Sequence, residues 1–234
     1  MKDKASYVQT MFTAIAGRYD LLNSLLSFQQ DRAWRRLVAS RANLQPGDLA
    51  LDIATGTGKM AQLLAQHNSK SKIVGIDFCP DMLDKARDNL ANSPHRERIQ
   101  LLSGDALRLP FSDNSFDCVT IVFALRNVVS IANAFHEMIR VLKPGGRVVS
   151  LELTRPTSWF IRPLYHVYLH YIMPSIGRLV SGNREAYTYL PQSIMIFSSP
   201  QEVKRIMEEA GMKDVETHSL TLGTATVHTG IKGI

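Results

Sequence analysis

The amino-acid sequence predicts an α/β fold in which helices cover both faces of a mostly parallel sheet of about seven strands. Three observations lead to this prediction. After residue 46, short apolar runs alternate with stretches of helical periodicity, which is typical of successive βαβ units. The first apolar run ends in a glycine-rich turn, Thr55-Gly56-Thr57-Gly58, as in sheets that bind a ligand at their carboxyl edge. The chain has 234 residues, of which 45% are hydrophobic, and this suffices for the core of one such domain.

The first two parts of this domain are a helical segment and the sheet itself. Residues 1–45 are expected to form helices at 5–16 and 29–41, separated by a turn at Gly17. Residues 46–154 form the core. A helix follows the glycine-rich turn, another opens at Pro80, and a third ends at the Pro-Gly-Gly of residues 144–146. The buried strands are expected at 49–54, 73–77, 99–103, 116–123 and 147–153.

The alternation of strands and helices then breaks. Residues 155–198 are rich in aromatic residues, Pro and Met, and are expected to form an inserted helical cap. Ser199 and Glu202 match a capping box with Pro at the first helical position. Residues 199–234 therefore complete the domain with a helix to about 210 and strands near 215–219 and 226–231.

Composition and charge argue against several classes of protein. Cys79 and Cys118 provide neither a disulfide framework nor a metal-ligand spacing, and His166 and His170 have no third ligand nearby, so we expect no metal. No stretch has the length and hydrophobicity of a signal peptide or a membrane span, which predicts a cytoplasmic protein. The net charge of +6 is dispersed along the chain, so no nucleic-acid partner is expected.

The glycine-rich turn and the acidic residue after the next strand form the strongest candidate binding site. Gly56 and Gly58 let the backbone turn sharply and approach a ligand without a Cβ clash. Asp77 ends the second predicted strand, where its carboxylate can accept hydrogen bonds from both hydroxyls of a ribose. A Walker A loop is excluded because Lys59 is not followed by Ser or Thr. A dinucleotide fingerprint stays open, since residues 56–61 fit its looser form.

Three further segments favour S-adenosylmethionine (SAM) over a dinucleotide. Asp105-Ala106 follows the third strand, Phe116-Asp117 opens the fourth, and the Lys-Pro-Gly-Gly of residues 143–146 precedes the fifth. This ordered set resembles the class I SAM-dependent methyltransferases, which have a Rossmann-like fold, over essentially the whole domain. The resemblance implies SAM as the cofactor. It places the cofactor against Gly56, Thr57, Gly58, Asp77, Asp105 and Ala106.

Four segments resemble one family more specifically, the C-methyltransferases of menaquinone and ubiquinone biosynthesis. They are Y-D-L-L-N-S-L-L-S from residue 19 continuing to Trp34, F-A-L-R-N-V at 123–128, R-V-L-K-P-G-G-R from residue 140 continuing to Thr154, and Tyr187, Tyr189, Leu190, Pro191 and Ser193 in the cap. Leu22, Ala124 and Thr154 replace the family's Met, Gly and Ser. Asp31 stands where the first signature has His. Because an anion there replaces a titrating imidazole, the identity of the quinone stays open.

The resemblance implies methyl transfer from SAM to a ring carbon of a polyprenylated quinol, such as a demethylmenaquinol or a ubiquinol precursor. Positioning supplies much of the rate. The remaining task is to deprotonate the quinol hydroxyl or to stabilise the phenolate. We assign this task to Arg126, whose cationic fork can lower a phenol pKa, to Asn127, which can orient the oxygen or a water, and to Tyr19. His136 and Glu152 could serve as bases, but a satisfied or solvated side chain is the simpler interpretation of each.

Two other functions stay open. The chain could be a class I methyltransferase for another small aromatic or lipid substrate, or a non-catalytic SAM-binding protein that keeps the fold. The aromatic residues of the cap, from Trp159 to Ile172, are compatible with a tunnel for a prenyl tail or with simple packing over the sheet. They are equally compatible with contact to a membrane surface, with Arg162 and Arg178 facing the lipid headgroups. Peripheral membrane contact and a homo-oligomer are thus both compatible with the sequence.

Overall fold

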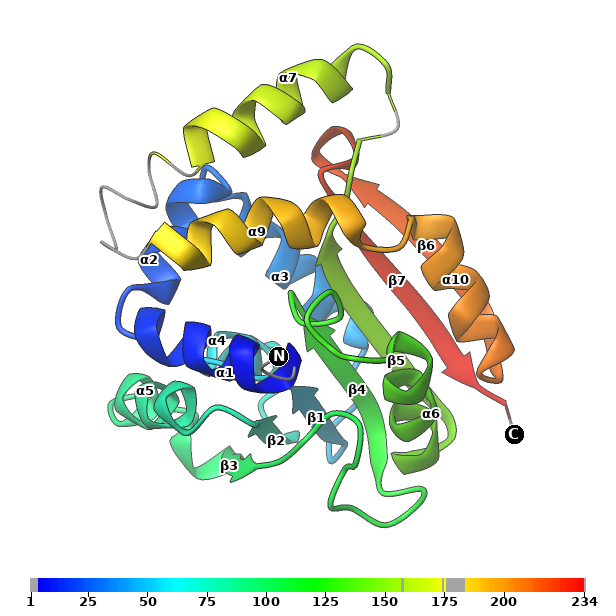
Figure 1. The fold of residues 1–234 in the computed structure, drawn as a ribbon. Helices are drawn as coiled ribbons and strands as arrows, with labels where there is room; N and C mark the ends of the chain where they lie inside the picture. The colour runs from blue at the N-terminus through cyan, green and yellow to red at the C-terminus, as the bar shows by residue number, and fades with distance from the viewer. Residues whose placement is uncertain (1–3, 157, 174, 176–183, 234) are drawn as a thin grey trace.

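The computed structural model describes residues 4–156, 158–173, 175 and 184–233, with the side chains of residues 184–188 excepted. At its centre is a seven-stranded sheet in the order β3-β2-β1-β4-β5-β7-β6 (Figure 1). Strand β7 runs antiparallel to both of its neighbours, and the other neighbouring strands are parallel. The predicted fold class is therefore confirmed.

The strands lie within a few residues of their predicted bounds, with one exception at the start of β5. Leu142 already pairs with Phe116 of β4, and the ladder resumes with Arg147 opposite Cys118 after a bulge. Because β5 begins at Leu142, the Pro-Gly-Gly segment lies inside the strand and not before it. Gly145 within this bulge has φ +76°, a backbone conformation that favours glycine. The strands are β1 (Leu49–Ile53), β2 (Lys72–Asp77), β3 (Ile99–Ser103), β4 (Phe116–Val122), β5 (Leu142–Leu153), β6 (Met212–Leu220) and β7 (Ala225–Lys232).

The helices of the first and last parts agree with the prediction except for α2, which the sequence analysis does not foresee. This helix has only two turns, and its Leu22 and Leu26 are buried one turn apart. Ser199 is the N-cap of α10, since its hydroxyl accepts a hydrogen bond from the Glu202 N–H, which is one of the two bonds of the predicted capping box. The helices are α1 (Lys4–Ile15), α2 (Tyr19–Leu26), α3 (Gln30–Ala42), α4 (Lys59–His67), α5 (Pro80–Leu90), α6 (Ile131–Val141) and α10 (Pro200–Glu209), with short 3₁₀ turns η1 (Arg96–Arg98) and η3 (Thr221–Gly223).

Each face of the sheet has its own hydrophobic core, because successive strand residues point to opposite faces. Leu51 of β1 packs in one core with Phe135 of α6 and Met207 of α10. Its neighbour Ala50 packs in the other core with Val38 of α3 and with α4. The two cores fix the strand ends that carry the glycine-rich turn and the loop after β4.

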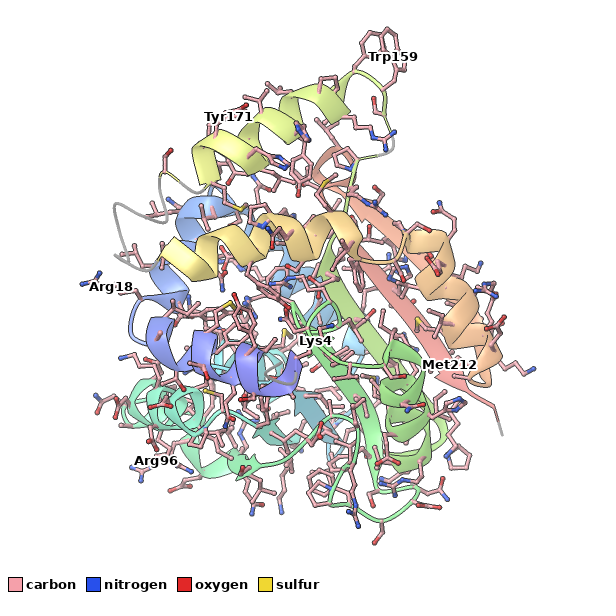
Figure 2. All side chains as sticks on the ribbon, in the orientation of Figure 1. Lys4, Arg18, Arg96, Trp159, Tyr171 and Met212 are labelled. Atoms are coloured by element: carbon pink, nitrogen blue, oxygen red, sulfur yellow. The ribbon has the colours of Figure 1, made fainter. Side chains whose placement is uncertain are left out.

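A third core joins the N-terminal helices to the cap. Leu22 of α2 packs there with Leu169 and Ile194 of the cap. Helices α1, α2, α7 and α9 lie together on one side of the sheet in Figure 1, and Figure 2 shows Trp159 at the outer end of the cap. No helix in the described ranges is long and apolar enough to cross a membrane. The cap elements are α7 (Ile161–Val167), the π-helical turn η2 (Tyr168–Ile172) that continues it, and α9 (Arg184–Ile196).

Candidate functional site

The glycine-rich turn after β1 has a backbone conformation that favours glycine. Gly56 and Gly58 have φ values of +56° and +80°, in the left-handed region. A Cβ at Gly58 would lie 3.3 Å from the Cβ of Ala86 in α5, whereas a Cβ at Gly56 would have no neighbour closer than 4.0 Å. The turn therefore packs against the protein at Gly58 and leaves room for a ligand at Gly56.

Asp77, at the end of β2, is the acidic residue that faces this turn. Its Oδ2 accepts a hydrogen bond from the Gly56 N–H at 2.8 Å, and its Oδ1 accepts one from the Cys79 N–H at 2.9 Å. Burial raises the pKa of the Asp77 carboxyl, and the backbone hydrogen bonds oppose this shift. Each carboxylate oxygen keeps a second lone pair, so both can also accept a hydrogen bond from a ligand hydroxyl.

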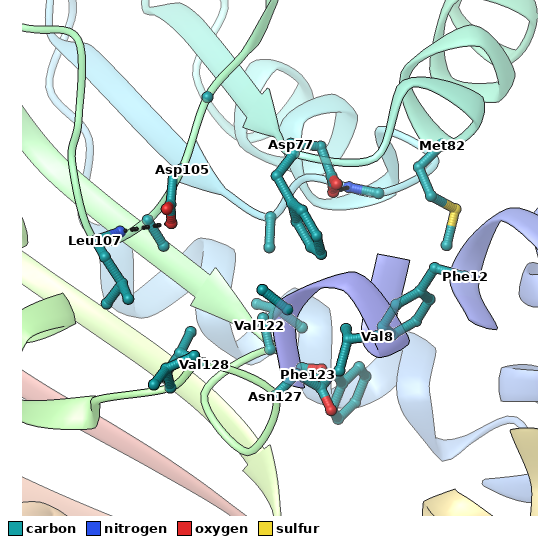
Figure 3. A pocket seen from close by; sticks show the side chains of 18 of the residues that line it. Val8, Phe12, Asp77, Met82, Asp105, Leu107, Val122, Phe123, Asn127 and Val128 are labelled. Carbon is teal, nitrogen blue, oxygen red and sulfur yellow. Dashed lines mark hydrogen bonds between the residues drawn. The ribbon is translucent and has the colours of Figure 1, made fainter. Parts of the chain in front are cut away.

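A cavity of about 120 Å³ lies at the carboxyl ends of β1, β2 and β4, and it is called the first cavity below (Figure 3). Val8 and Phe12 of α1 close it from the side opposite the sheet. It brings together residues that are far apart in the sequence, from α2, the glycine-rich turn and three loops. The predicted site residues that line it are Tyr19, Gly56, Asp77, Asp105, Ala106 and Asn127.

Two of the predicted cofactor residues, Thr57 and Gly58, lie beside this cavity and do not line it. Thr57 Oγ1 donates a hydrogen bond to Asp20 Oδ1 at 2.8 Å, and Lys59 Nζ lies 3.3 Å from the same oxygen. These contacts attach α2 to the glycine-rich turn. Asp20, which the sequence analysis does not single out, therefore fixes Tyr19 of the same helix over the cavity.

Arg126 follows β4 and forms a buried ion pair with Glu152 of β5. The two side chains are 7% and 2% exposed. The guanidinium donates to Glu152 Oε1 and to the Phe123 carbonyl, and the Arg126 N–H donates to Glu152 Oε2. Glu152 is set aside as a base when only the sequence is considered, yet it lies next to Leu151, the residue that pairs with Val122 at the end of β4. The parallel pairing of these two strand ends is the signal from which a role for Glu152 could have been predicted.

Two more cavities lie beside the first, and neighbouring cavities share lining residues. One of about 30 Å³, called the neck below, lies between α1, α2 and α9, and one of about 440 Å³, the large cavity, lies beneath the cap. Tyr19 and Asn127 line both the first cavity and the neck, and Arg126 lines both the neck and the large cavity. Tyr189 of α9 donates a hydrogen bond to Asn127 Oδ1 at 3.1 Å. The three predicted catalytic residues therefore lie where the cavities meet.

The large cavity has a mainly apolar wall, much of which comes from the cap. Of the aromatic cap residues considered above, Tyr165 and Tyr168 line it, whereas Trp159, Phe160 and Tyr171 are exposed. Burial raises the pKa of both lining tyrosines, so they stay neutral. Arg178 and the side chain of Tyr187 lie outside the described residues. The cap residues in the wall are Ile161, Leu164, Tyr165, Tyr168, Ile172 and Met173.

Two buried donors at the neck have no hydrogen-bond partner among the described residues. They are Asn23 Nδ2 and Arg126 Nε, and both residues line the neck and the large cavity. An unsatisfied buried donor costs about 1–3 kcal/mol, and a ligand oxygen could accept from it. Asn23 is missed by the sequence analysis. It lies one helical turn after Tyr19, and that spacing signals a shared face only once α2 is known to be a helix.

Asp31, which stands where the similar family has His, lies in the wall of the large cavity. Its side chain is buried, and its Oδ1 accepts a hydrogen bond from Ser27 Oγ at 3.2 Å. Arg35 Nε lies 3.8 Å from Asp31 Oδ2, and the Arg35 guanidinium lies 5.1 Å from the centre of the Phe123 ring. The anion at position 31 is therefore matched by a buried cation.

The described part of the chain contains no group of three His, Cys, Asp or Glu side chains that could hold a metal ion. The rings of His166 and His170 stack with their centres 3.9 Å apart on the exposed surface of the cap. Cys79 and Cys118 are buried free thiols. The polar groups of this site are thus carboxylates, amides, hydroxyls and a guanidinium.

The chain is similar to known proteins over nearly its whole length. A demethylmenaquinone methyltransferase of Desulfitobacterium hafniense is 40% identical, over 99% of this chain and 92% of that protein. The ubiquinone/menaquinone biosynthesis C-methyltransferase UbiE of Geotalea daltonii is 43% identical, over 99% of each chain. Among solved structures, the cyclase SpnF matches with a TM-score of 0.72 at 21% identity, over 98% of this chain and 97% of that one. The last likeness shows a shared fold.

The sequence model of the ubiE/COQ5 methyltransferase family matches residues 1–232 of this chain. The match therefore includes the N-terminal helices and the cap as well as the sheet. It confirms the predicted resemblance, with SAM as the cofactor and methyl transfer as the class of reaction. The chain belongs to the ubiE/COQ5 methyltransferase family.

Proposed function

We propose that this chain methylates a ring carbon of a polyprenylated quinol, a demethylmenaquinol or a ubiquinol precursor. One observation carries the proposal: the first cavity and the large apolar cavity meet at a neck formed in part by Tyr19, Arg126 and Asn127. A cofactor on one side and a lipid-tailed ring on the other could thus face each other. The names of the relatives, which include demethylmenaquinone methyltransferase, support the same substrate class.

The residues around the first cavity fit SAM in their chemistry. Asp77 has lone pairs free for the ribose hydroxyls, and the open space over Gly56 lets the cofactor approach the backbone. Asp105 and Ala106 border the cavity where an adenine edge would lie. Thr57 would act indirectly, through the bond to Asp20 that holds α2 over the site. When bound, SAM supplies an electrophilic methyl group on its sulfonium.

The neck would hold the oxygen of the quinol ring beside the reacting carbon. Arg126 Nε and Asn23 Nδ2 have no hydrogen-bond partner among the described residues, and a donor that binds a phenol oxygen favours its ionised form. Glu152 keeps the guanidinium plane fixed, so Arg126 is preorganised and does not swing into the cavity. Asn127, held by Tyr189, and Tyr19 would orient the ring relative to the cofactor.

The apolar wall of the large cavity would accommodate the prenyl tail, with Tyr165 and Tyr168 stacked along it. Such a substrate resides in a bilayer, so we propose that the protein works in peripheral contact with a membrane. A different aromatic or lipid substrate is the second candidate. Asp31 favours it, because a buried carboxylate in the cavity wall only accepts hydrogen bonds, whereas an imidazole can also donate one, so the two select different substrate groups.

Transfer of a labelled methyl group from SAM to a panel of reduced quinones tests the proposal. The panel includes demethylmenaquinol, ubiquinol precursors and tail-free analogues, with bulk RNA as the control acceptor. Label on the ring carbon of a prenylated quinol is the expected result. SAM binding without label on any quinol would overturn the proposal and favour the second candidate or a non-catalytic SAM-binding protein.

A further inference from the structure

The outer face of the cap carries an apolar stripe that no described part of the protein covers. Phe160, Leu164, Val167 and Tyr171 recur at spacings of four, three and four residues, which places them on one side of α7 and η2. Their exposed fractions run from 47% to 69%, and Trp159 at the end of the helix is 73% exposed. Figure 2 shows Trp159 projecting away from the body of the protein.

This stripe is unusual because the inner face of the same helix is apolar as well. Leu169 and Met173 are buried against α1, α2 and α9, and Tyr165 lines the large cavity. A surface helix of a soluble protein normally turns a polar face to water. A continuous exposed apolar patch next to a ligand cavity marks an interaction surface.

The stripe continues into the mouth of the large cavity. Phe28, Leu164, Ile172 and Leu222 line that cavity and are also 45% to 72% exposed. They come from three separate parts of the chain, namely the α2–α3 turn, the cap and η3. Their side chains therefore form an apolar rim through which a lipid tail could pass without meeting water.

The first part of the cap carries charge of one sign. Residues 153–184 contain four arginines and neither aspartate nor glutamate. Arg162, next to the stripe, is exposed, and no ion pair is recorded for it among the described residues. An apolar stripe that has an exposed arginine beside it and ends in Trp has the chemistry of an interfacial helix on an anionic bilayer.

We propose that this face, made of Trp159, Phe160, Leu164, Val167 and Tyr171, docks on the surface of an anionic lipid bilayer. Docking places the rim of the large cavity against the acyl chains. A prenylated substrate can then enter tail-first while its ring reaches the neck. The route of entry rests on the proposed function, whereas lipid binding itself does not. A second copy of this chain on the same face is the competing occupant.

Flotation with vesicles free of quinone tests the docking directly. The full chain should bind vesicles of phosphatidylglycerol and phosphatidylcholine more tightly than vesicles of phosphatidylcholine alone. The double variant Phe160→Glu/Val167→Glu should lose at least about tenfold in affinity, because it places two charges in the apolar contact. Arg162→Glu should weaken binding to the anionic vesicles only. Ile196→Glu is the matched control, since Ile196 is 82% exposed but lines none of the three cavities.

Methyl transfer to a tail-free quinol separates failure of this proposal from failure of the proposed function. Phe160 and Val167 do not line the large cavity, so the double variant should keep wild-type turnover on the tail-free substrate and lose it on a vesicle-borne one. Absence of vesicle binding by the wild type, or equal binding by the double variant, overturns the docking proposal even if quinol methylation stands. Sedimentation of the wild type as a dimer and of the double variant as a monomer overturns it in favour of self-association.

Discussion

Arg126 is held by Glu152 across the ends of two neighbouring strands, with both side chains almost fully buried. The carboxylate receives hydrogen bonds from the guanidinium and from the Arg126 and Leu153 backbone N–H groups. This satisfies Glu152, whereas Arg126 Nε has no hydrogen-bond partner among the residues that the structure describes. The pair therefore fixes the orientation of a cation that lines the neck and the large cavity.

Replacing Glu152 should cost stability and turnover together. Glu152→Ala leaves a buried guanidinium without a counter-ion, and removal of one member of a buried pair costs about 3–5 kcal/mol. Urea unfolding should show this loss, and Glu152→Gln should lose less because it keeps one acceptor. Glu209→Ala is the control, since it removes an exposed pair with Arg205, and such pairs contribute little. A Glu152→Ala protein as stable as wild type would contradict the pairing.

Asn23 should matter for the substrate and not for the cofactor. Asn23→Ala removes a donor from the neck and should lower kcat/KM for the quinol by about tenfold, equivalent to about 1.4 kcal/mol. Asn23→Asp should be worse, because it replaces the donor by an anion beside the developing phenolate. SAM affinity, measured by calorimetry, should stay unchanged in both variants. Asn92→Ala, at an exposed position, is the control, and wild-type turnover of Asn23→Asp would remove the amide from this role.

Arg126→Ala should lower turnover more than Asn23→Ala while SAM affinity stays near that of the wild type. Arg126 lines the neck and the large cavity but not the first cavity, so its loss acts on the quinol. Removal of the guanidinium also leaves Glu152 buried and unpaired, so the stability of the variant must be measured alongside. Equal losses of SAM affinity and turnover would exclude a role specific to the substrate.

Asp77 should set the affinity for SAM. Asp77→Ala removes the acceptors for the ribose and also the bonds that hold the Gly56 and Cys79 N–H groups, so a loss of at least about tenfold is expected by calorimetry. Asp77→Asn keeps one acceptor and should be intermediate. Asp84→Ala on the exposed side of α5 serves as the control. Unchanged affinity in Asp77→Ala would exclude the carboxylate from the cofactor site.

The sheet could be predicted from sequence because its signals are local. Apolar runs of strand length, punctuated by Gly and Pro, indicate buried strands without knowledge of their neighbours. The predicted start of β5 was wrong because the bulge at Gly145 depends on pairing with β4. Helix α2 was missed because two turns are too short to form alone; Leu22 and Leu26 gain their burial from the cap.

Some residues of the candidate site could likewise be predicted from local signals, and others could not. Gly56 and Asp77 follow from the topological rule that parallel strands present their carboxyl ends at one edge. Asn23 and Glu152 do not, since each matters through a partner or a cavity that other elements supply. The large cavity also depends on tertiary contacts, because its wall combines residues of α2, α3, the cap and η3.

Asp52, beneath the glycine-rich turn, should make stability depend on pH. Its carboxylate accepts hydrogen bonds from Thr55 Oγ1 at 2.6 Å and Thr120 Oγ1 at 2.8 Å, yet complete burial raises its pKa to about 6. The folded protein therefore binds this proton more tightly than the unfolded chain, whose aspartates titrate near 3.9. The contribution of Asp52 to the free energy of unfolding is full below about pH 4 and falls as the pH rises to about 6.

Asp52→Asn removes this titration and keeps one acceptor. The stability of the variant relative to wild type should rise by about 3 kcal/mol between about pH 4 and pH 7, since each unit of pKa shift is worth about 1.4 kcal/mol. His228 titrates over the same range with the opposite sign, because burial lowers its pKa to about 4. His228 is present in both proteins, so its contribution cancels when the free energies of unfolding measured in urea are subtracted. A difference that stays constant with pH would mean that Asp52 is ionised in the folded protein throughout this range.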